Sequence, residues 1–196
     1  MNTFVIRGRC IAAPPPSDWR DELTRRLGAK PRRIGTWAEL GLFGALRCLA
    51  ESGETALPHN ALLLLGSRRG TYAATAQVLE QMRDGQQPMP LAFLQTQPSQ
   101  LLALLAAQLE WQGDACFLAG AQPLALLRLA AAQTDKADAL LGWVDEMDGG
   151  SSQWLRLGRC TAEGNDFVAA AQEEMFSAAV SHLRIAAAGL QVCHAG

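Results

Sequence analysis

Residues 61–67 read Ala-Leu-Leu-Leu-Leu-Gly-Ser, and residues 115–120 read Ala-Cys-Phe-Leu-Ala-Gly. Each stretch is short, apolar throughout and closed by glycine or serine, which is typical of a strand buried on both faces of a sheet. A third run of this kind covers residues 137–144. Helical patterns separate the runs, so the sequence predicts an α/β fold with a mostly parallel mixed sheet flanked by helices.

The other expected elements follow from apolar spacing and turn residues. Strands are expected at residues 4–11 and 154–157, and a loop at Pro88 and Pro90. Thr36 is the expected cap of one helix. No linker divides the chain, so residues 1–196 are expected to form a single domain. Helices are expected at residues 19–27, 37–49, 72–83, 99–110, 124–132 and, at the C-terminus, about 167–188.

Composition narrows the classes of function. Of 196 residues, 49% are hydrophobic, and 17 basic against 19 acidic residues give a net charge of −2. This apolar content excludes a disordered chain, and the sequence lacks the basic excess typical of nucleic-acid proteins, although a local basic patch is compatible with it. Five cysteines without a CxxC pair, and no signal-peptide pattern, predict reduced thiols and a cytoplasmic protein. No apolar run is long enough to predict a membrane span.

Two loops at expected strand ends are candidate ligand sites. Residues 66–71, Gly-Ser-Arg-Arg-Gly-Thr, precede a helix whose N-terminus could hold a phosphate. They lack the Gly-Lys-Ser/Thr of a P-loop, and an ordinary glycine turn is the favoured interpretation. Asp145, Glu146 and Asp148 could hold a divalent ion, but a solvated acidic loop is favoured.

Side chains for catalysis are scarce. Cys116 is a conceivable nucleophile, but inside an apolar strand a thiol behaves as a small hydrophobe, whereas a reactive thiolate needs an accessible, electropositive setting. His59, His182 and His194 are widely spaced and match no zinc-ligand pattern. We therefore assign no catalytic residue, no metal site and no cofactor from the residues alone.

Several segments, in order and spacing, resemble the N-terminal half of β-ketoacyl synthases, which have the thiolase fold. The resemblance covers about residues 4–157. It rests on the Ala/Leu-rich residues 37–53, on Leu-Leu-Leu-Leu-Gly-Ser-Arg-Arg-Gly at 62–70, on residues 88–113 with Pro90 and Phe93, and on Ala-Asp-Ala-Leu-Leu-Gly at 137–142. Ketosynthases are longer, and their two catalytic histidines lie in the half that this chain does not match.

The resemblance gives Gln122 a special place. Ketosynthases carry their nucleophilic cysteine at the strand-to-helix turn that corresponds to residues 120–122, where a helix N-terminus lowers the pKa of a thiol. The matched residue here is Gln122, whose amide cannot form a thioester. Chain-length factors, the non-condensing partners of ketosynthases, include members with glutamine at this position, so the chain resembles a chain-length factor.

The resemblance implies a non-catalytic subunit in fatty-acid or polyketide biosynthesis, of the kind found in bacterial aryl polyene pigment pathways. Its expected partners are a ketosynthase-type subunit or a second copy in a homodimer, and an acyl carrier protein, with no nucleic acid. The alternative is an acyl-thioester enzyme, either an acyltransferase of the β-ketoacyl-ACP synthase type or a decarboxylase, that uses Cys116 or Gln122. A plain α/β small-molecule-binding protein is the third hypothesis.

The helices expected at residues 100–110 and 124–132 are apolar around almost their whole circumference. A helix of this kind is normally buried. We expect one small domain to leave part of this apolar surface uncovered, so that both helices contribute to an interface with another subunit. The expected association runs across residues 115–119, with a second copy or a ketosynthase-type partner. The alternative is that residues 167–188 fold back and cover this surface.

Overall fold

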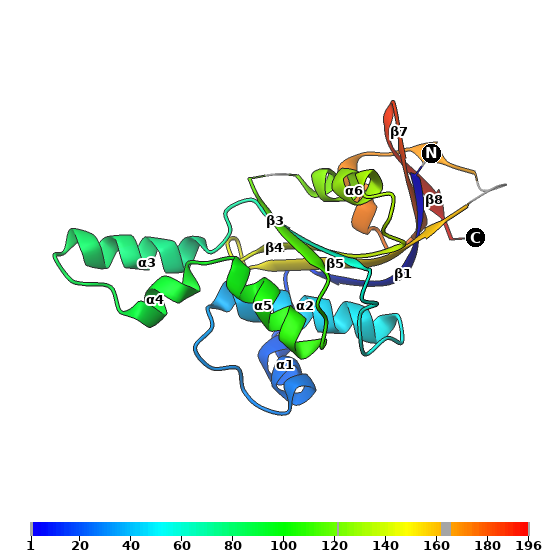
Figure 1. Cartoon of the computed structure of the whole chain (residues 1–196). Helices are drawn as coiled ribbons and strands as arrows, with labels where there is room; N and C mark the ends of the chain where they lie inside the picture. Colours follow the sequence, from blue (N-terminus) through cyan, green and yellow to red (C-terminus); the bar gives the residue numbers. More distant parts are fainter. Residues whose placement is uncertain (1, 121, 162–165, 196) are drawn as a thin grey trace.

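The computed structural model describes residues 2–120, 122–161 and 166–195. Eight strands form one sheet in the order β3-β2-β4-β5-β1-β7-β8-β6, with helices on both faces (Figure 1). The strands are β1 (Asn2–Ala12), β2 (Leu62–Ser67), β3 (Asp114–Ala119), β4 (Asp138–Asp145), β5 (Ser151–Cys160), β6 (Val168–Ala169), β7 (Val180–Ala186) and β8 (Gly189–His194).

The expected mixed α/β sheet with flanking helices is confirmed, but the sheet is mostly antiparallel rather than mostly parallel. Among the described strands, the parallel pairs are β2 with β3 and β2 with β4. The ladders from β4 through β5, β1, β7 and β8 to β6 are antiparallel. The parallel part is the part whose strands are separated by helices, since a crossover between parallel strands needs a long connection. The strand at residues 154–157 is confirmed within β5, although β5 is not the last strand.

One face of the sheet is covered by helices α1 (Trp19–Leu27), α2 (Thr36–Glu51) and α5 (Ser99–Gln108) (Figure 1). All three occur where the sequence predicted them, although Gly35 rather than Thr36 takes the N-cap position of α2. The packing is led by large side chains that are at most 1% exposed, among them Trp37, Phe43, Leu101 and Leu105. This cluster packs α2 against one face of the central strands β4, β5 and β1.

Two glycines allow α2 and β4 to approach the Trp154 indole. A Cβ atom on Gly142 would lie 2.5 Å from the Trp154 ring, and one on Gly44 would lie 2.1 Å from Ser152 Oγ. The indole N–H donates to Ser152 Oγ at 3.0 Å, and that hydroxyl donates to the Leu40 carbonyl at 2.8 Å. The buried polar atoms are therefore paired, as a fully buried tryptophan requires.

The other face is covered by α6 (Pro123–Ala132) and by a 3₁₀ helix, η1 (Gln172–Phe176) (Figure 1). Leu126 and Leu127 of α6 are fully buried in the same cluster as Met175 and Phe176. Leu101 and Leu105 bury α5 in the same way on the opposite face. Each helix thus buries one side against the sheet, while its other residues are partly or fully exposed. The expectation that α5 and α6 contribute to an apolar interface stays a prediction.

The expected C-terminal helix at about 167–188 is also wrong. This segment forms β6, η1 and β7 and ends in a turn at residues 187–188, after which β8 begins at Gly189. Its alanines favour a helix by propensity, but the hydrogen bonds that β1 offers along its free edge, together with burial of Val180 and Leu183, override that preference. As in the alternative, part of this segment packs against α6, but through η1 and β7 rather than through one long helix.

Helices α3 (Tyr72–Arg83) and α4 (Pro90–Gln95) project from the body of the molecule (Figure 1). We call these two helices and their connection the arm. Val78 is the one buried residue of α3, and α4 has none. The loop expected at Pro90 is wrong, because proline fits the first turn of a helix, where its missing N–H leaves no bond unmade.

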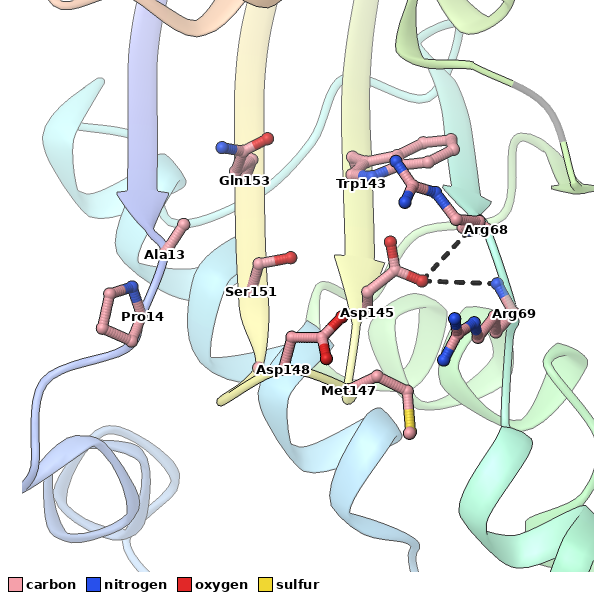
Figure 2. A pocket seen from close by; sticks show the side chains of 11 residues that line it. Ala13, Pro14, Arg68, Arg69, Trp143, Asp145, Met147, Asp148, Ser151 and Gln153 are labelled. Atoms are coloured by element: carbon pink, nitrogen blue, oxygen red, sulfur yellow. Dashed lines mark hydrogen bonds between the residues drawn. The ribbon is translucent and has the colours of Figure 1, made fainter.

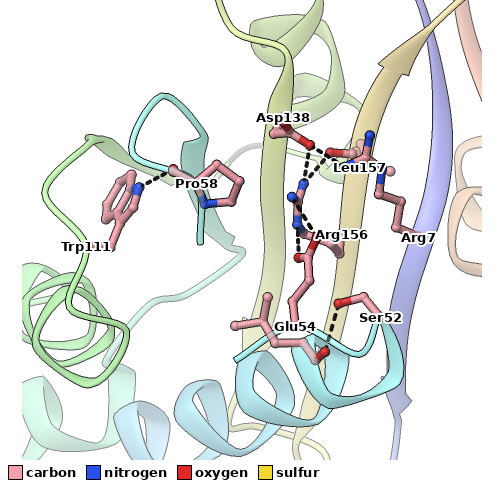
Figure 3. Close-up of polar contacts among 9 residues, drawn as sticks. Arg7, Ser52, Glu54, Pro58, Trp111, Asp138, Arg156 and Leu157 are labelled. Atoms are coloured by element: carbon pink, nitrogen blue, oxygen red, sulfur yellow. Dashed lines mark hydrogen bonds and ion pairs between the residues drawn. The ribbon is translucent and has the colours of Figure 1, made fainter. Parts of the chain in front are cut away.

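A buried ion pair ties the sheet to the end of α2. The Arg156 side chain, fully buried on β5, donates to Glu54 at 2.5 and 3.1 Å and to Asp138 at 2.9 Å (Figure 3). It also donates to the Leu157 carbonyl at 2.7 Å. Its charge is thus compensated, as burial of an arginine requires.

None of the helices in the described ranges combines the length and apolar character needed to span a bilayer.

Candidate functional site

A cleft lies where β2, β3 and β4 end, the edge at which α/β sheets bind ligands. It consists of two adjoining hollows of about 400 and 450 Å³. Both are lined by Arg68, which follows β2, by Trp143 of β4 and by Gln153, its partner on β5. Figure 2 shows the first hollow, with these three side chains along one side. We call the two hollows together the cleft.

Gln122 lies in the second hollow, directly before α6. It is exposed, has extended backbone angles and occupies the N-cap position, with Pro123 as the first helical residue. Gly120, with φ of 66°, makes the turn at the end of β3, and its N–H donates to the Ser67 carbonyl at 3.0 Å. The predicted strand-to-helix turn is confirmed, while the functional role of Gln122 stays a prediction.

The turn at residues 66–71, the candidate phosphate site, is already occupied by the Asp145 side chain. One oxygen of Asp145 accepts hydrogen bonds from Ser67 Oγ at 2.8 Å and from the backbone N–H groups of Arg68 and Arg69 at 3.1 and 3.3 Å (Figure 2). Ser67 Oγ in turn accepts from the Gly70 N–H at 2.7 Å. The donors that a phosphate would use are thus taken by Asp145.

The acidic residues after β4 do not converge. Asp145 faces the turn just described, whereas Glu146 turns toward α3, where it accepts the Ala73 N–H at 2.7 Å. Burial raises the pKa of Glu146, and the hydrogen bonds from Ala73 and Trp37 oppose that rise. Within the described ranges, no three His, Cys, Asp or Glu side chains are grouped as metal ligands would be.

Cys116 lies away from the cleft. It sits in the middle of β3, half-buried, with its Sγ 3.8 Å from the Phe117 carbonyl oxygen. β3 is the edge strand of the sheet and is partly exposed, so the expectation of a strand buried on both faces is wrong there. Burial raises the pKa of Cys10 to about 11 and raises that of Cys48 further, which leaves both thiols protonated at neutral pH.

The three histidines also lie away from the cleft. His59 precedes β2, at the opposite end of the parallel strands, and His182 and His194 belong to the C-terminal hairpin. Among the described residues that line the two hollows, there is no histidine and no cysteine. The cleft therefore offers neither a thiol nor an imidazole for the attack on an acyl group.

The cleft also contains residues that the sequence did not single out. Gln172 and Phe176 reach it from η1, and Gln153 reaches it from β5. Arg68 lies in the candidate phosphate loop, and Trp143 lies in one of the strands that the sequence predicts. Amide and guanidinium donors thus line the site together with the carboxylates of Asp145, Asp148 and Glu173, and these donors can hold a carbonyl oxygen.

No protein-family model matches this sequence, and no curated protein matches it. Solved structures do match its fold. The ishigamide ketosynthase/chain length factor superposes with a TM-score of 0.63 at 17% identity, covering 83% of this chain and 64% of that one. The ketosynthase ApeO in complex with its chain length factor ApeC, from Xenorhabdus doucetiae, gives a TM-score of 0.55 at 13% identity. This match covers 86% of this chain and 80% of that one.

A third match is the AntDE:AntF complex, a type II PKS acyl-carrier protein with its ketosynthase. It gives a TM-score of 0.56 at 11% identity, covering 81% of this chain and 63% of that one. The chain therefore has a ketosynthase- and chain-length-factor-like fold, the class that the sequence resemblance indicated. It spans about 64% of the length of the ishigamide protein chain.

Proposed function

We propose that the chain is a non-catalytic, chain-length-factor-like subunit of a polyketide or fatty-acid pathway, of the aryl polyene type. The observation that carries this proposal is Gln122. It stands at the turn between β3 and α6, exposed in the cleft, at the position that the sequence resemblance matches to the ketosynthase nucleophile. An amide there can bind an acyl group by hydrogen bonds but cannot form a thioester with it.

The remaining chemistry of the cleft supports binding rather than turnover. Cys116 lies in mid-strand, and the described lining contains no imidazole to act as a base. Arg68 and Gln153 line the same hollow as Gln122 and supply hydrogen-bond donors to it. A subunit with such a cleft contributes shape and polar contacts to a condensing reaction that a partner carries out.

The partner in this proposal is a ketosynthase-type subunit, with a second copy of this chain as the other possibility. β3 is an edge strand, and its outer backbone groups can pair with a strand of another subunit. The matches to a ketosynthase in complex with its chain length factor, and to one bound to an acyl-carrier protein, support these partners. We place the assembly in the cytoplasm.

The test uses the purified chain, incubated with acyl- and malonyl-loaded carrier protein and followed by intact-mass measurement and product analysis. We expect no acyl adduct and no condensation product from the chain alone, and condensation when a cognate ketosynthase is added. Condensation by the chain alone would overturn the proposal. Loss of that activity in Cys116→Ser would then identify the nucleophile.

An acyl-thioester decarboxylase is the second candidate, because Gln122 and Arg68 line the same hollow and both can donate to a thioester carbonyl. Donors aimed at a developing oxyanion lower the barrier to decarboxylation. Carbon dioxide release from malonyl-carrier protein by the chain alone, lost in Gln122→Ala and retained in Cys116→Ser, would favour this activity. Absence of release would leave the binding role.

A further inference from the structure

The arm carries a concentration of exposed apolar side chains that the cleft does not use. Leu79 and Met82 of α3 are 60% and 57% exposed, and Phe93 and Leu94 of α4 are 57% and 53% exposed. These four side chains line a groove of about 880 Å³ between the two helices. No residue that lines this groove lines either hollow of the cleft.

A basic loop adjoins one end of this groove. Residues 25–33 hold five basic and no acidic residues, although the whole chain has a net charge of −2. Lys30, Arg32 and Arg33, on the connection between α1 and α2, are exposed, and no described acidic side chain pairs with them. Arg20, Arg26 and Arg47, in contrast, pair with Glu22 or Glu39. We call Lys30, Arg32 and Arg33 the basic loop.

Contacts at the end of α4 and just beyond it place the basic loop near the groove. A Cβ atom on Gly35 would lie 3.7 Å from the Cβ of Gln95, which follows the groove residue Leu94. The Gln100 side chain donates to the Arg33 carbonyl at 3.4 Å. Thr71 Oγ donates to the Thr96 carbonyl at 2.7 Å and closes the base of the arm. The basic loop therefore lies next to the end of α4, whose Phe93 and Leu94 line the groove.

We infer that this surface docks an acidic amphipathic helix of a partner protein. A groove between two helices takes a third helix, whose apolar stripe replaces water over the exposed side chains. α3 has 12 residues and is about 18 Å long, which matches about three turns of a docked helix. Acidic residues flanking that stripe would meet the basic loop, which selects the partner by charge and speeds its association.

Two other occupants fit less well. A nucleic acid would use the cations but has no aliphatic face for the groove. An anionic membrane would also use the cations, but it presents a flat surface, whereas the apolar side chains here line a concave one. The inference concerns a surface outside the cleft, so it holds whether or not the chain serves a ketosynthase.

The test measures fluorescence anisotropy of a labelled helical peptide of about 12 residues, with a leucine stripe flanked by glutamates, titrated with the full chain. The matched probes are the same peptide with lysines in place of glutamates, and a scrambled acidic peptide without the stripe. We expect binding of the acidic amphipathic peptide alone, weakened by added salt. Equal binding of the lysine or scrambled peptide, or no binding of the acidic one, would overturn the inference.

Variants separate the groove from the cations. Leu79→Glu and Phe93→Glu should each weaken binding about tenfold or more, since both put a like charge into an apolar contact. The double variant Arg32→Glu/Arg33→Glu should weaken binding by a similar factor and reduce its salt dependence. Arg128→Glu, a charge reversal at an exposed position on α6, should leave it unchanged.

Circular dichroism should show the same fold for all variants, because every substituted side chain is exposed. Sedimentation with vesicles of anionic phospholipid tests the membrane. Vesicle binding that Leu79→Glu does not affect would assign the basic loop to a lipid surface and overturn the inference. Self-association of the wild type that Phe93→Glu abolishes, without peptide binding, would assign the groove to a second copy and overturn it as well.

Discussion

The sheet and the arm are built from similar apolar side chains but expose them very differently. Leu65, in the middle of β2, is completely buried between two layers of helices, whereas Leu79 on α3 is 60% exposed. The difference comes from tertiary cover: strands and helices pack on both sides of β2, while α3 packs mainly against α4. Apolar composition alone therefore does not tell structural leucines from leucines available to a partner.

The largest expected effect is in the sheet, at Arg156. Arg156→Leu leaves Glu54 and Asp138 without their shared buried partner, so we expect a loss of about 3–5 kcal/mol in the free energy of unfolding. Urea denaturation measures it. Arg7→Leu is the matched control, because Arg7 also pairs with Asp138, at 2.9 Å, but is 45% exposed. That exposed pair should contribute at most about 1 kcal/mol. An equal loss of unfolding free energy in the two variants would show that burial does not decide how much these ion pairs stabilise the fold.

The second prediction compares the two leucines directly. Leu65→Ala removes fully buried methyl groups from the core and should cost about 2–5 kcal/mol of unfolding free energy. Leu79→Ala, on the exposed face of the arm, should change the unfolding free energy by less than about 0.5 kcal/mol. Thermal and urea unfolding of the two variants and the wild type check the pair.

A large loss in Leu79→Ala would mean that a part of the chain, or a second copy, covers the arm in solution. Light scattering at the concentration of the unfolding experiment separates these cases. The pair of variants thus tests whether the arm is an unpartnered surface, which is the condition for docking a helix on it.

Most of the parallel half of the fold could be predicted from local signals. The apolar run at residues 61–65 and the spacing of Leu40 and Phe43 lead to β2 and α2, because a buried strand and an amphipathic helix have different periods. Gly120 and Pro123 locate the turn at Gln122 for equally local reasons. Gly142, by contrast, has no local signal: its lack of a side chain matters only because the Trp154 ring packs against it.

The C-terminal hairpin and half of the cleft could not be predicted in this way. Alanine-rich residues 167–188 have high helix propensity, and only pairing with β1, far away in the sequence, makes β7 a strand. Gln172 and Phe176 enter the cleft through that same segment. Asp145 could be seen as acidic, but its occupation of the turn at Ser67 depends on the register of β2 against β4.

The smallest expected effect is at Glu146, which joins the sheet to the arm. Its carboxylate accepts the Ala73 N–H at the start of α3, and burial raises its pKa, so the folded chain holds the proton more tightly than the unfolded chain does. Folding stability attributable to this group therefore falls as the pH rises through the raised pKa.

Glu146→Gln keeps an oxygen acceptor for Ala73 and removes the charge. The melting temperature of the variant should equal that of the wild type at acidic pH and exceed it by at most a few degrees at neutral pH. Calorimetry across the pH range measures both. Asp148→Asn, which removes the charge of a neighbouring exposed carboxylate, is the matched control. A Glu146→Gln variant that melts below the wild type at neutral pH would mean that the negative charge at the N-terminus of α3 outweighs its burial, and that the arm is held to the sheet by this charge.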